Sequence, residues 1–101
     1  MSTEETDADI LKSKRHEILS IANSHGARNV RVFGSFARRT AVMGISDLDL
    51  LVQLDPGYSL LDIIAIKQDL EDLLGCEVDV VTEAAISPYI RERVLSEAIL
   101  L

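Results

Sequence analysis

Aromatic side chains and positive charge are both scarce in this sequence. Only 4% of its 101 residues are aromatic, and tryptophan is absent. Proteins that bind single-stranded nucleic acid stack bases on aromatic faces, and nucleic-acid-binding proteins in general gain affinity from Lys and Arg that neutralise phosphates. A formal net charge of −7 opposes that second source of affinity. The composition therefore argues against a small RNA-binding module, and we expect no direct binding of nucleic acid.

Cysteine and long apolar runs are equally limited. The chain has one cysteine, Cys76, so a single chain can form neither a disulfide framework nor a thiolate zinc site. No apolar segment approaches the roughly 20 residues needed to span a bilayer. The acidic start of the sequence also lacks the basic and then apolar pattern of a signal peptide. We therefore expect a cytoplasmic protein without membrane contact.

The sequence does contain enough apolar material for one packed core. Hydrophobic residues make up 48% of the chain, which is ordinary for a single globular domain. We expect residues 9–101 to form that domain and residues 1–8 to be a flexible N-terminus.

Periodicity and turn residues predict alternating helices and strands. Ser59 and Asp62 form an approximate capping box at the start of one helix. The second and third strands are joined by a helix and should be parallel, whereas the short link between the first two favours a mixed sheet. The expected order is a helix over about residues 9–25, a strand over 28–33, a short helix over about 35–40, a strand over 48–54, a helix over 59–74, a strand over 77–82 and a helix from Pro88.

The apolar spacing of the later helices predicts which side chains they bury. The four C-terminal residues allow two interpretations: they pack on the protein's own sheet, which we favour, or they form an exposed docking surface. The two histidines, His16 and His25, are expected on the surface. The buried residues expected are Ile63, Ile66, Leu70 and Leu73 in the 59–74 helix, and Ile90, Val94, Leu95 and Ala98 in the last helix.

Two aspartates lie two residues apart where the second strand begins. In a strand, Asp47 and Asp49 would point to one face with Cα atoms roughly 7 Å apart, so that both carboxylates could bind one hard cation. Aspartate is unfavourable in strands, and two on one face would repel each other without a positive partner. The alternative is that both lie in the preceding loop as solvated caps.

Asp79 strengthens the metal-binding interpretation. It stands between valines in the third strand, where burial without a partner would cost several kcal/mol. An aspartate there would be tolerated if it faced the same cation as Asp47 and Asp49. The alternative is an edge strand with Asp79 facing water.

Gly34-Ser35 lies where the first strand meets the short helix. Glycine permits close backbone approach, and free N–H groups at a helix N-terminus attract phosphate. The Ser35 hydroxyl adds a hydrogen-bond donor. Arg38, one turn later, could also face a phosphate, and a solvated arginine is the alternative.

Together these segments resemble the minimal nucleotidyltransferases of the polymerase-beta superfamily, small domains often found as antitoxins beside HEPN-domain toxins. The resemblance spans roughly residues 28–101. It implies an α/β (α+β) nucleotidyltransferase fold, a small mixed sheet of about three to four strands flanked by helices. The motifs that carry it are Val32-Phe-Gly-Ser-Phe-Ala-Arg38, Ser46-Asp-Leu-Asp-Leu-Leu-Val52 and Val78-Asp-Val-Val81.

The resemblance also implies roles for these residues. Asp47, Asp49 and Asp79 would be the catalytic carboxylates and would bind Mg²⁺, as two ions. Gly34 and Ser35 would hold the triphosphate of ATP or another nucleoside triphosphate, with Arg38 as a further candidate phosphate ligand.

Two features depart from the family's usual pattern. The stretch between Ser35 and Asp47 is about one residue longer than is common, and Arg39 stands where a glycine often follows. Both departures bear on nucleotide placement more than on metal binding.

A site of this kind suggests attack by an acceptor hydroxyl on the α-phosphorus of the nucleotide, with release of pyrophosphate. The motifs and their supporting helices use nearly the whole chain, so we expect the acceptor on another protein, and a homo- or hetero-oligomer is possible. By resemblance this partner would be a HEPN toxin that receives AMP. A second hypothesis is an antitoxin that neutralises its partner by binding alone, and the three carboxylates beside Gly34-Ser35 favour the enzyme.

Overall fold

The structure, a computed structural model, describes residues 7–35, 37, 38 and 47–101. Of the N-terminus expected to be flexible, residues 1–6 lie outside this description, and Asp7 and Ala8 belong to the first helix. No helix among the described residues has the length and apolar character needed to cross a membrane. The elements are α1 (Asp7–Ser24), β1 (Ala27–Phe33), β2 (Leu48–Leu54), α2 (Leu60–Leu74), β3 (Val78–Thr82), a 3-10 turn η1 (Glu83–Ala85), α3 (Pro88–Glu97) and β4 (Ile99–Leu100).

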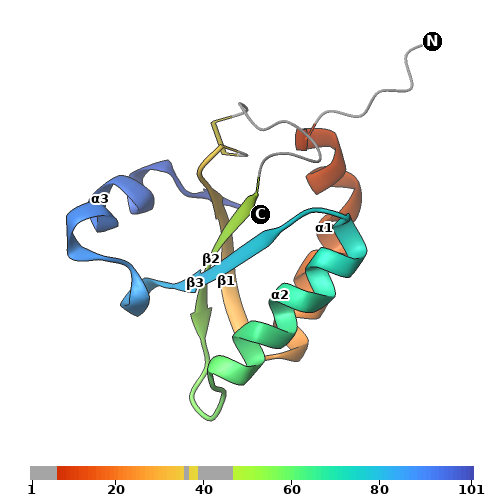
Figure 1. Cartoon of the computed structure of the whole chain (residues 1–101), viewed down its shortest axis with the longest axis horizontal. Helices are drawn as coiled ribbons and strands as arrows, with labels where there is room; N and C mark the ends of the chain where they lie inside the picture. The colour runs from red at the N-terminus through yellow and green to blue at the C-terminus, as the bar shows by residue number, and fades with distance from the viewer. Residues whose placement is uncertain (1–6, 36, 39–46) are drawn as a thin grey trace.

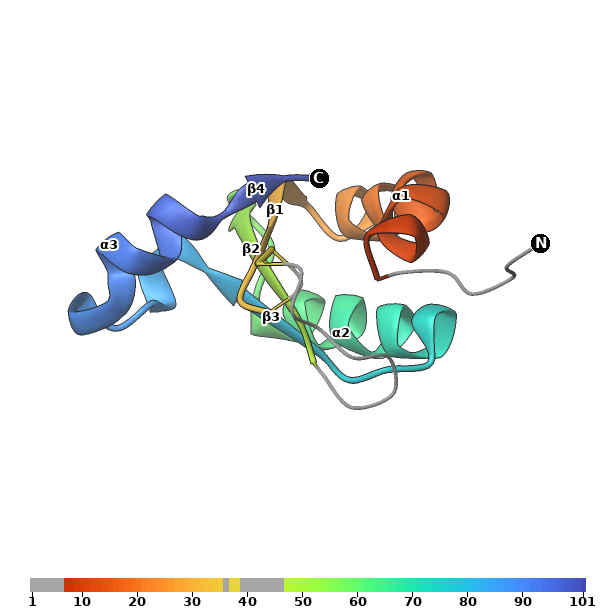
Figure 2. The ribbon, with the colours of Figure 1, turned by 90° about the horizontal axis from the view of Figure 1, so that it is seen from above.

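The four strands form one mixed sheet in the order β3-β2-β1-β4. β2 and β3 are parallel, and β1 is antiparallel to both β2 and β4. Helices α1 and α2 lie side by side on one face of the sheet, whereas α3 lies on the opposite side (Figures 1 and 2). The sheet expected from the sequence is therefore confirmed, with β4 as a strand that the pattern did not predict.

The core lies between the sheet and the pair α1 and α2. Alternate residues of β2, Leu48, Leu50 and Val52, are fully buried there, because successive strand side chains point to opposite faces. Ile66 and Leu70 supply the buried stripe of α2, and Ile63 and Leu73 pack beside them partly buried. Each such aliphatic side chain contributes about 1.5–3 kcal/mol when fully buried.

A β-bulge in β1 lets more of its residues reach this core. The register with β2 shifts between Arg28 and Arg31, and Asn29 adopts a left-handed conformation with φ 53°. The extra residue changes the alternation of the strand. As a result Ala27, Val30 and Val32 are all buried on the same face, although simple alternation would turn Ala27 away.

Helix α2 has the caps that the sequence predicts. The Ser59 hydroxyl accepts a hydrogen bond from the Leu61 N–H, the Asp62 carboxylate accepts one from the Ser59 N–H, and Gly75 ends the helix with φ 69°. His25 lies at this capped end, half-buried, with Nδ1 3.3 Å from Asp62 Oδ1. The surface position expected for His25 was therefore wrong, because the loop after α1 folds back onto α2.

The last helix buries less than its apolar spacing predicts. Only Val94 is buried, whereas Ile90 and Leu95 are 49% and 36% exposed, because one side of α3 alone approaches the sheet. The chain then leaves the helix, and Ile99 pairs with Val32 as part of β4. The Leu101 N–H donates to the Val30 carbonyl at 3.0 Å. The tail thus packs on the protein's own sheet, as favoured.

Candidate functional site

Asp49 is the best-placed of the three predicted carboxylates. β2 begins at Leu48, so Asp49 is its second residue and Asp47 directly precedes it. Leu48 and Leu50 face the core, and the half-buried Asp49 therefore lies on the opposite face. The alternative placed both aspartates in the loop before the strand. It is wrong for Asp49, which lies within β2, whereas Asp47 does lie before the strand.

Asp79 lies directly across from Asp49. The parallel register pairs Asp49 with Asp79 on adjacent strands, so two acids separated by thirty positions in the sequence share one face of the sheet. β3 is an edge strand and Asp79 is exposed. Because Asp79 is exposed, the cost of burying it without a partner does not arise. The alternative of an edge strand with Asp79 facing water is therefore correct, and Asp79 nevertheless lies opposite Asp49.

The neighbouring acids change the pKa of the Asp49 carboxyl. Partial burial raises the pKa of Asp49 most, and the negative charges of Asp79 and Asp47 raise it further, to about 6. A hydrogen bond with Asp79 adds to the increase, while the positive charge of Arg38 opposes it. Ionising all three acids at neutral pH therefore costs free energy, which a bound cation would offset.

Gly34 brings the backbone against this carboxylate. It follows the last residue of β1, Phe33, which pairs with Asp49, and it has φ 72°. A Cβ added at Gly34 would collide with Asp49 Oδ2. Glycine is therefore favoured at this position for two reasons: the left-handed backbone conformation and the close approach of the Asp49 carboxylate.

The turn after Gly34 carries the other predicted phosphate ligands. Ser35 is half-buried in this turn, and the Arg38 N–H donates to the Gly34 carbonyl at 3.1 Å, which makes one helical turn. Residues 36 and 39–46, which include Arg39, the longer loop and part of the expected short helix, lie outside the described residues.

Arg38 has a partner that the sequence did not predict. Its Nη1 donates to both carboxylate oxygens of Glu97, the last residue of α3, at 3.0 and 3.1 Å. The two side chains line a hollow of about 170 Å³ between the Gly34 turn and α3. Glu97 therefore holds one nitrogen of Arg38, whose positive charge also acts on the Asp49 carboxyl.

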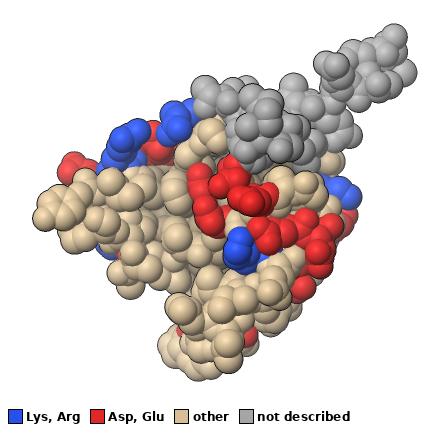
Figure 3. Space-filling view, viewed as in Figure 1, with Lys and Arg blue, Asp and Glu red and all other residues tan. Residues whose placement is uncertain are grey.

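The donor set fits a hard divalent cation. Within the described residues, no three His, Cys, Asp or Glu side chains already lie close enough to form a complete metal centre. Asp79 and Asp47 nevertheless both act on the pKa of Asp49, and ionised carboxylates repel one another. The donors they offer are all carboxylate oxygens, which Mg²⁺ prefers. Figure 3 shows acidic side chains gathered on the face of the molecule seen in Figure 1.

Comparison with known proteins identifies the family. Residues 15–101 match the family described as nucleotidyltransferase domain. The chain belongs to this family. Protein adenylyltransferase MntA of Thermococcus cleftensis is 37% identical over 91 residues, which cover 82% of this chain and 91% of that protein. A Methanocaldococcus jannaschii protein, provisionally named a protein adenylyltransferase, is 41% identical over 85 residues, which cover 84% and 90% of the two chains.

Solved structures agree with this assignment. One that is provisionally described as a minimal nucleotidyltransferase is 46% identical, with a TM-score of 0.82 and 100% of both chains covered. A toxin–antitoxin crystal structure with AMP-PNP aligns with a TM-score of 0.71 over 84% of this chain and 69% of that chain. Its identity of 20% shows a shared fold alone. The nucleotidyltransferase fold and enzyme class predicted from the sequence are confirmed.

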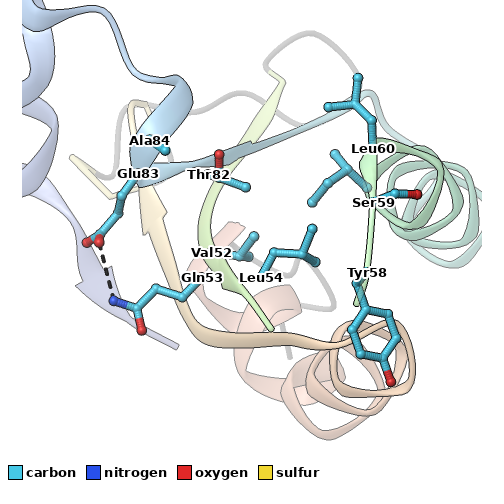
Figure 4. Close-up of a pocket in the computed structure, with 10 residues that line it drawn as sticks. Val52, Gln53, Leu54, Tyr58, Ser59, Leu60, Thr82, Glu83 and Ala84 are labelled. Atoms are coloured by element: carbon cyan, nitrogen blue, oxygen red, sulfur yellow. Dashed lines mark hydrogen bonds between the residues drawn. The ribbon is translucent and has the colours of Figure 1, made fainter. Parts of the chain in front are cut away.

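A second hollow of this nucleotidyltransferase lies away from the carboxylates. About 470 Å³ in volume, it lies beyond the carboxyl ends of β2 and β3, between Val52, Tyr58 and Glu83 (Figure 4). Gln53 Nε2 donates to Glu83 Oε2 at 3.2 Å on its wall. Asp49 and Asp79 lie toward the opposite ends of the two strands, so this hollow is not part of the candidate site.

Proposed function

We propose that this nucleotidyltransferase transfers AMP from ATP to a hydroxyl group of a partner protein in a Mg²⁺-dependent reaction, as the antitoxin of a toxin–antitoxin pair. The observation that carries the proposal is the pairing of Asp49 with Asp79 across two parallel strands, with Gly34 against the Asp49 carboxylate. An acid whose pKa is raised by burial and by two neighbouring acids, beside a glycine turn, is typical of a catalytic site and has no evident structural benefit.

In this reaction the acceptor oxygen forms a bond to the α-phosphorus. The bond between the α-phosphorus and the oxygen that bridges it to the β-phosphorus breaks, and pyrophosphate leaves. The proton of the acceptor hydroxyl passes to the Asp79 carboxylate, which is exposed and so can reach an incoming protein side chain. Asp79 is thus the proposed general base.

The metal would be held by Asp47, Asp49 and Asp79. When bound, Mg²⁺ supplies positive charge that stabilises the entering and leaving oxygens of an in-line displacement. Asp49 contributes most to this binding, because it is half-buried between its neighbours and gains most when its negative charge is balanced.

The nucleotide would lie against the turn that starts at Gly34. The left-handed Gly34 lets a phosphate approach the backbone, and Ser35 offers a hydroxyl and an N–H group. Arg38 keeps donors beyond the Nη1 bound to Glu97, since a guanidinium carries five N–H groups. ATP is proposed as the donor because two relatives are named as protein adenylyltransferases.

The partner is proposed to be a toxin of the HEPN-domain type. Two lines support a protein acceptor: the names of the relatives, and the fold shared with toxin–antitoxin structures. The exposed position of Asp79 on an edge strand is compatible with an acceptor as large as a protein.

A labelled-nucleotide experiment tests the proposal. The purified chain is incubated with ATP labelled at the α-phosphate, Mg²⁺ and the product of the neighbouring gene, and the labelled protein is located on a denaturing gel. We expect label on the partner, dependent on Mg²⁺ and lost with EDTA. The control uses ATP labelled at the γ-phosphate, which should leave both proteins unlabelled because pyrophosphate departs.

A stable complex without label transfer would contradict the enzyme and favour an antitoxin that acts by binding alone. Transfer from GTP, CTP or UTP in preference to ATP would keep the reaction class and overturn the choice of nucleotide.

A further inference from the structure

Strand β3 carries Asp79 on the edge of the sheet. Among the strands that the structure describes, its hydrogen-bonded neighbour is β2, on one side only. The backbone groups on the other side of an edge strand need other partners, and edge strands are weakly fixed without them. The position of Asp79 relative to Asp49 therefore depends on what holds the outer side of β3.

Two side chains of α2 bind the outer backbone of β3 at Val78, the residue next to Asp79. Glu71 Oε2 accepts a hydrogen bond from the Val78 N–H at 3.0 Å. Lys67 Nζ donates to the Val78 carbonyl at 2.9 Å and to Glu71 Oε2 at 2.9 Å. The N–H and the carbonyl of Val78 are thus both bonded, and the two side chains that bind them are bonded to each other.

The inner side of β3 is fixed at the same level. The Leu48 N–H donates to the Glu77 carbonyl at 2.9 Å, and the Val78 side chain is fully buried in the core. Val78 is therefore held by its side chain and by both outer backbone groups. Asp79, the next residue, projects from the opposite face and pairs with Asp49.

The charges of the two side chains reinforce this arrangement. The hydrogen bond to Glu71 is the largest cause of a raised pKa of Lys67, and the negative charges of Asp79 and Glu77 also raise it. The hydrogen bonds from Lys67 and from the Val78 N–H hold the pKa of Glu71 below its usual range. Both groups are thus charged at neutral pH, and charge-assisted hydrogen bonds are stronger than neutral ones.

We propose that Lys67 and Glu71 are positioning residues that fix Asp79 opposite Asp49 by binding both outer backbone groups of Val78. The inference rests on the proposed function only for its effect on catalysis. Neither side chain touches the nucleotide or the acceptor in this proposal, and both act through the backbone of β3.

Helix α2 is a suitable support for this contact. Lys67 and Glu71 are four residues apart and so lie on the same side of the helix. The helix is itself fixed by its buried residues Ile66 and Leu70 and by the Ser59 cap. Any movement of β3 away from α2 would break charged hydrogen bonds, which gives the edge strand one preferred position.

The first measurement is amide hydrogen exchange of the full chain by NMR. Variants Lys67→Met and Glu71→Ala each remove a partner of Val78, and Lys12→Met is the matched control, because it removes a lysine charge from an exposed position of α1. We expect exchange of the Val78 amide about tenfold faster in Glu71→Ala, the order expected for the loss of one charged hydrogen bond. Lys67→Met should show a smaller increase, and Lys12→Met none.

The second measurement is the Mg²⁺ dependence of AMP transfer. In Lys67→Met and Glu71→Ala we expect kcat to fall about tenfold and the Mg²⁺ concentration for half-maximal rate to rise, as for loss of residues that orient metal ligands. KM for ATP should stay within about twofold, because Gly34, Ser35 and Arg38 are untouched. Lys67→Arg should recover most of the rate, since Arg can donate to both acceptors.

The hydrogen-exchange and activity measurements test different parts of the proposal. Unchanged exchange at Val78 in both variants would overturn the contact itself. Faster exchange with unchanged kcat and Mg²⁺ dependence would overturn the positioning of Asp79. If the unaltered chain transfers no AMP, the proposed function fails. The positioning would then be tested by Mg²⁺-induced shifts of the Asp79 amide, which should weaken in Glu71→Ala and which, if unchanged, would overturn it.

Discussion

Gly34 lies so close to the Asp49 carboxylate that no other residue fits there without moving it. Gly34 directly follows β1, and Asp49 belongs to the neighbouring antiparallel strand β2, where it pairs with Phe33. The glycine turn and the acidic strand are therefore one structural unit. A change at Gly34 should act first on the carboxylate and only then on the fold.

Gly34→Ala should reduce Mg²⁺-dependent transfer by at least about a hundredfold, because the new Cβ displaces the Asp49 carboxylate that would bind the metal. Gly75→Ala is the matched control: Gly75 has φ 69° but nothing within 4 Å of an added Cβ. Both variants should lose roughly 1–2 kcal/mol of stability through the left-handed conformation, measured by urea unfolding. Equal activity in the two variants would show that the Gly34 contact with Asp49 is unimportant.

Asp49→Asn should make the protein in EDTA more stable at neutral pH and change it little at pH 4. The pKa of Asp49 is raised from 3.8 to about 6 in the folded chain. A raised pKa favours the neutral acid, so its contribution to stability is complete below about pH 4 and is lost as the pH rises through about 6. The difference in Tm between the variant and the unaltered chain should grow over that interval.

Added Mg²⁺ should make the unaltered chain more stable than Asp49→Asn, the reverse of the order expected in EDTA. At pH 7.5 it should raise the Tm of the unaltered chain, because it binds the ionised carboxylates, and should leave Asp49→Asn nearly unchanged. An equal shift in both proteins would place the bound ion elsewhere.

Asp47→Asn, Asp49→Asn and Asp79→Asn should each abolish transfer, by at least about a hundredfold, while leaving the fold intact. None of the three supplies core packing, since the core consists of apolar residues. Rates with labelled ATP and far-ultraviolet circular dichroism check the two halves of this prediction. Full activity in any one variant would remove that aspartate from the site.

Arg38→Met should raise KM for ATP several-fold and change kcat less, because it removes a candidate phosphate ligand. Glu97→Gln is the informative companion, since it removes the negative charge that Arg38 binds. An exposed ion pair of this kind is worth at most about 1 kcal/mol, so Glu97→Gln should leave stability nearly unchanged and should lower KM or leave it as it is. A rise in KM with Glu97→Gln would mean that Glu97 aims Arg38 at the nucleotide and does not compete with it.

Ser59→Ala should cost about 1 kcal/mol of stability, the usual effect of losing a helix cap, with no change in transfer rate. Ser59 lies at the start of α2, next to the end of β2 that is remote from Asp49. Urea unfolding and the transfer assay are measured on the same preparation. A large loss of activity at unchanged stability would show that the capped end of α2 takes part in the reaction.

Much of the fold followed from local patterns in the sequence. The bounds of β2 and the capping box of α2 were predicted correctly, because alternating apolar residues and a Ser-x-x-Asp sequence act through near neighbours. The expected burial of Ile90 and Leu95 and the surface position of His25 were wrong. Those depend on how far α3 stands from the sheet and on how the loop after α1 packs against α2, which no local pattern specifies.

The sequence alone indicated which residues form the candidate site. Asp49 and Asp79 stand out because aspartate is costly in strands unless its charge is needed, and Gly34 stands out because glycine at the end of a strand permits close backbone approach. Only the tertiary structure decided how they meet. The parallel register sets Asp79 opposite Asp49, the antiparallel one sets Gly34 against the same carboxylate, and Lys67 and Glu71 reach Val78 from another element. Such contacts depend on strand order and register. Both arise from long-range packing, so the spacing of residues along the chain does not predict these contacts.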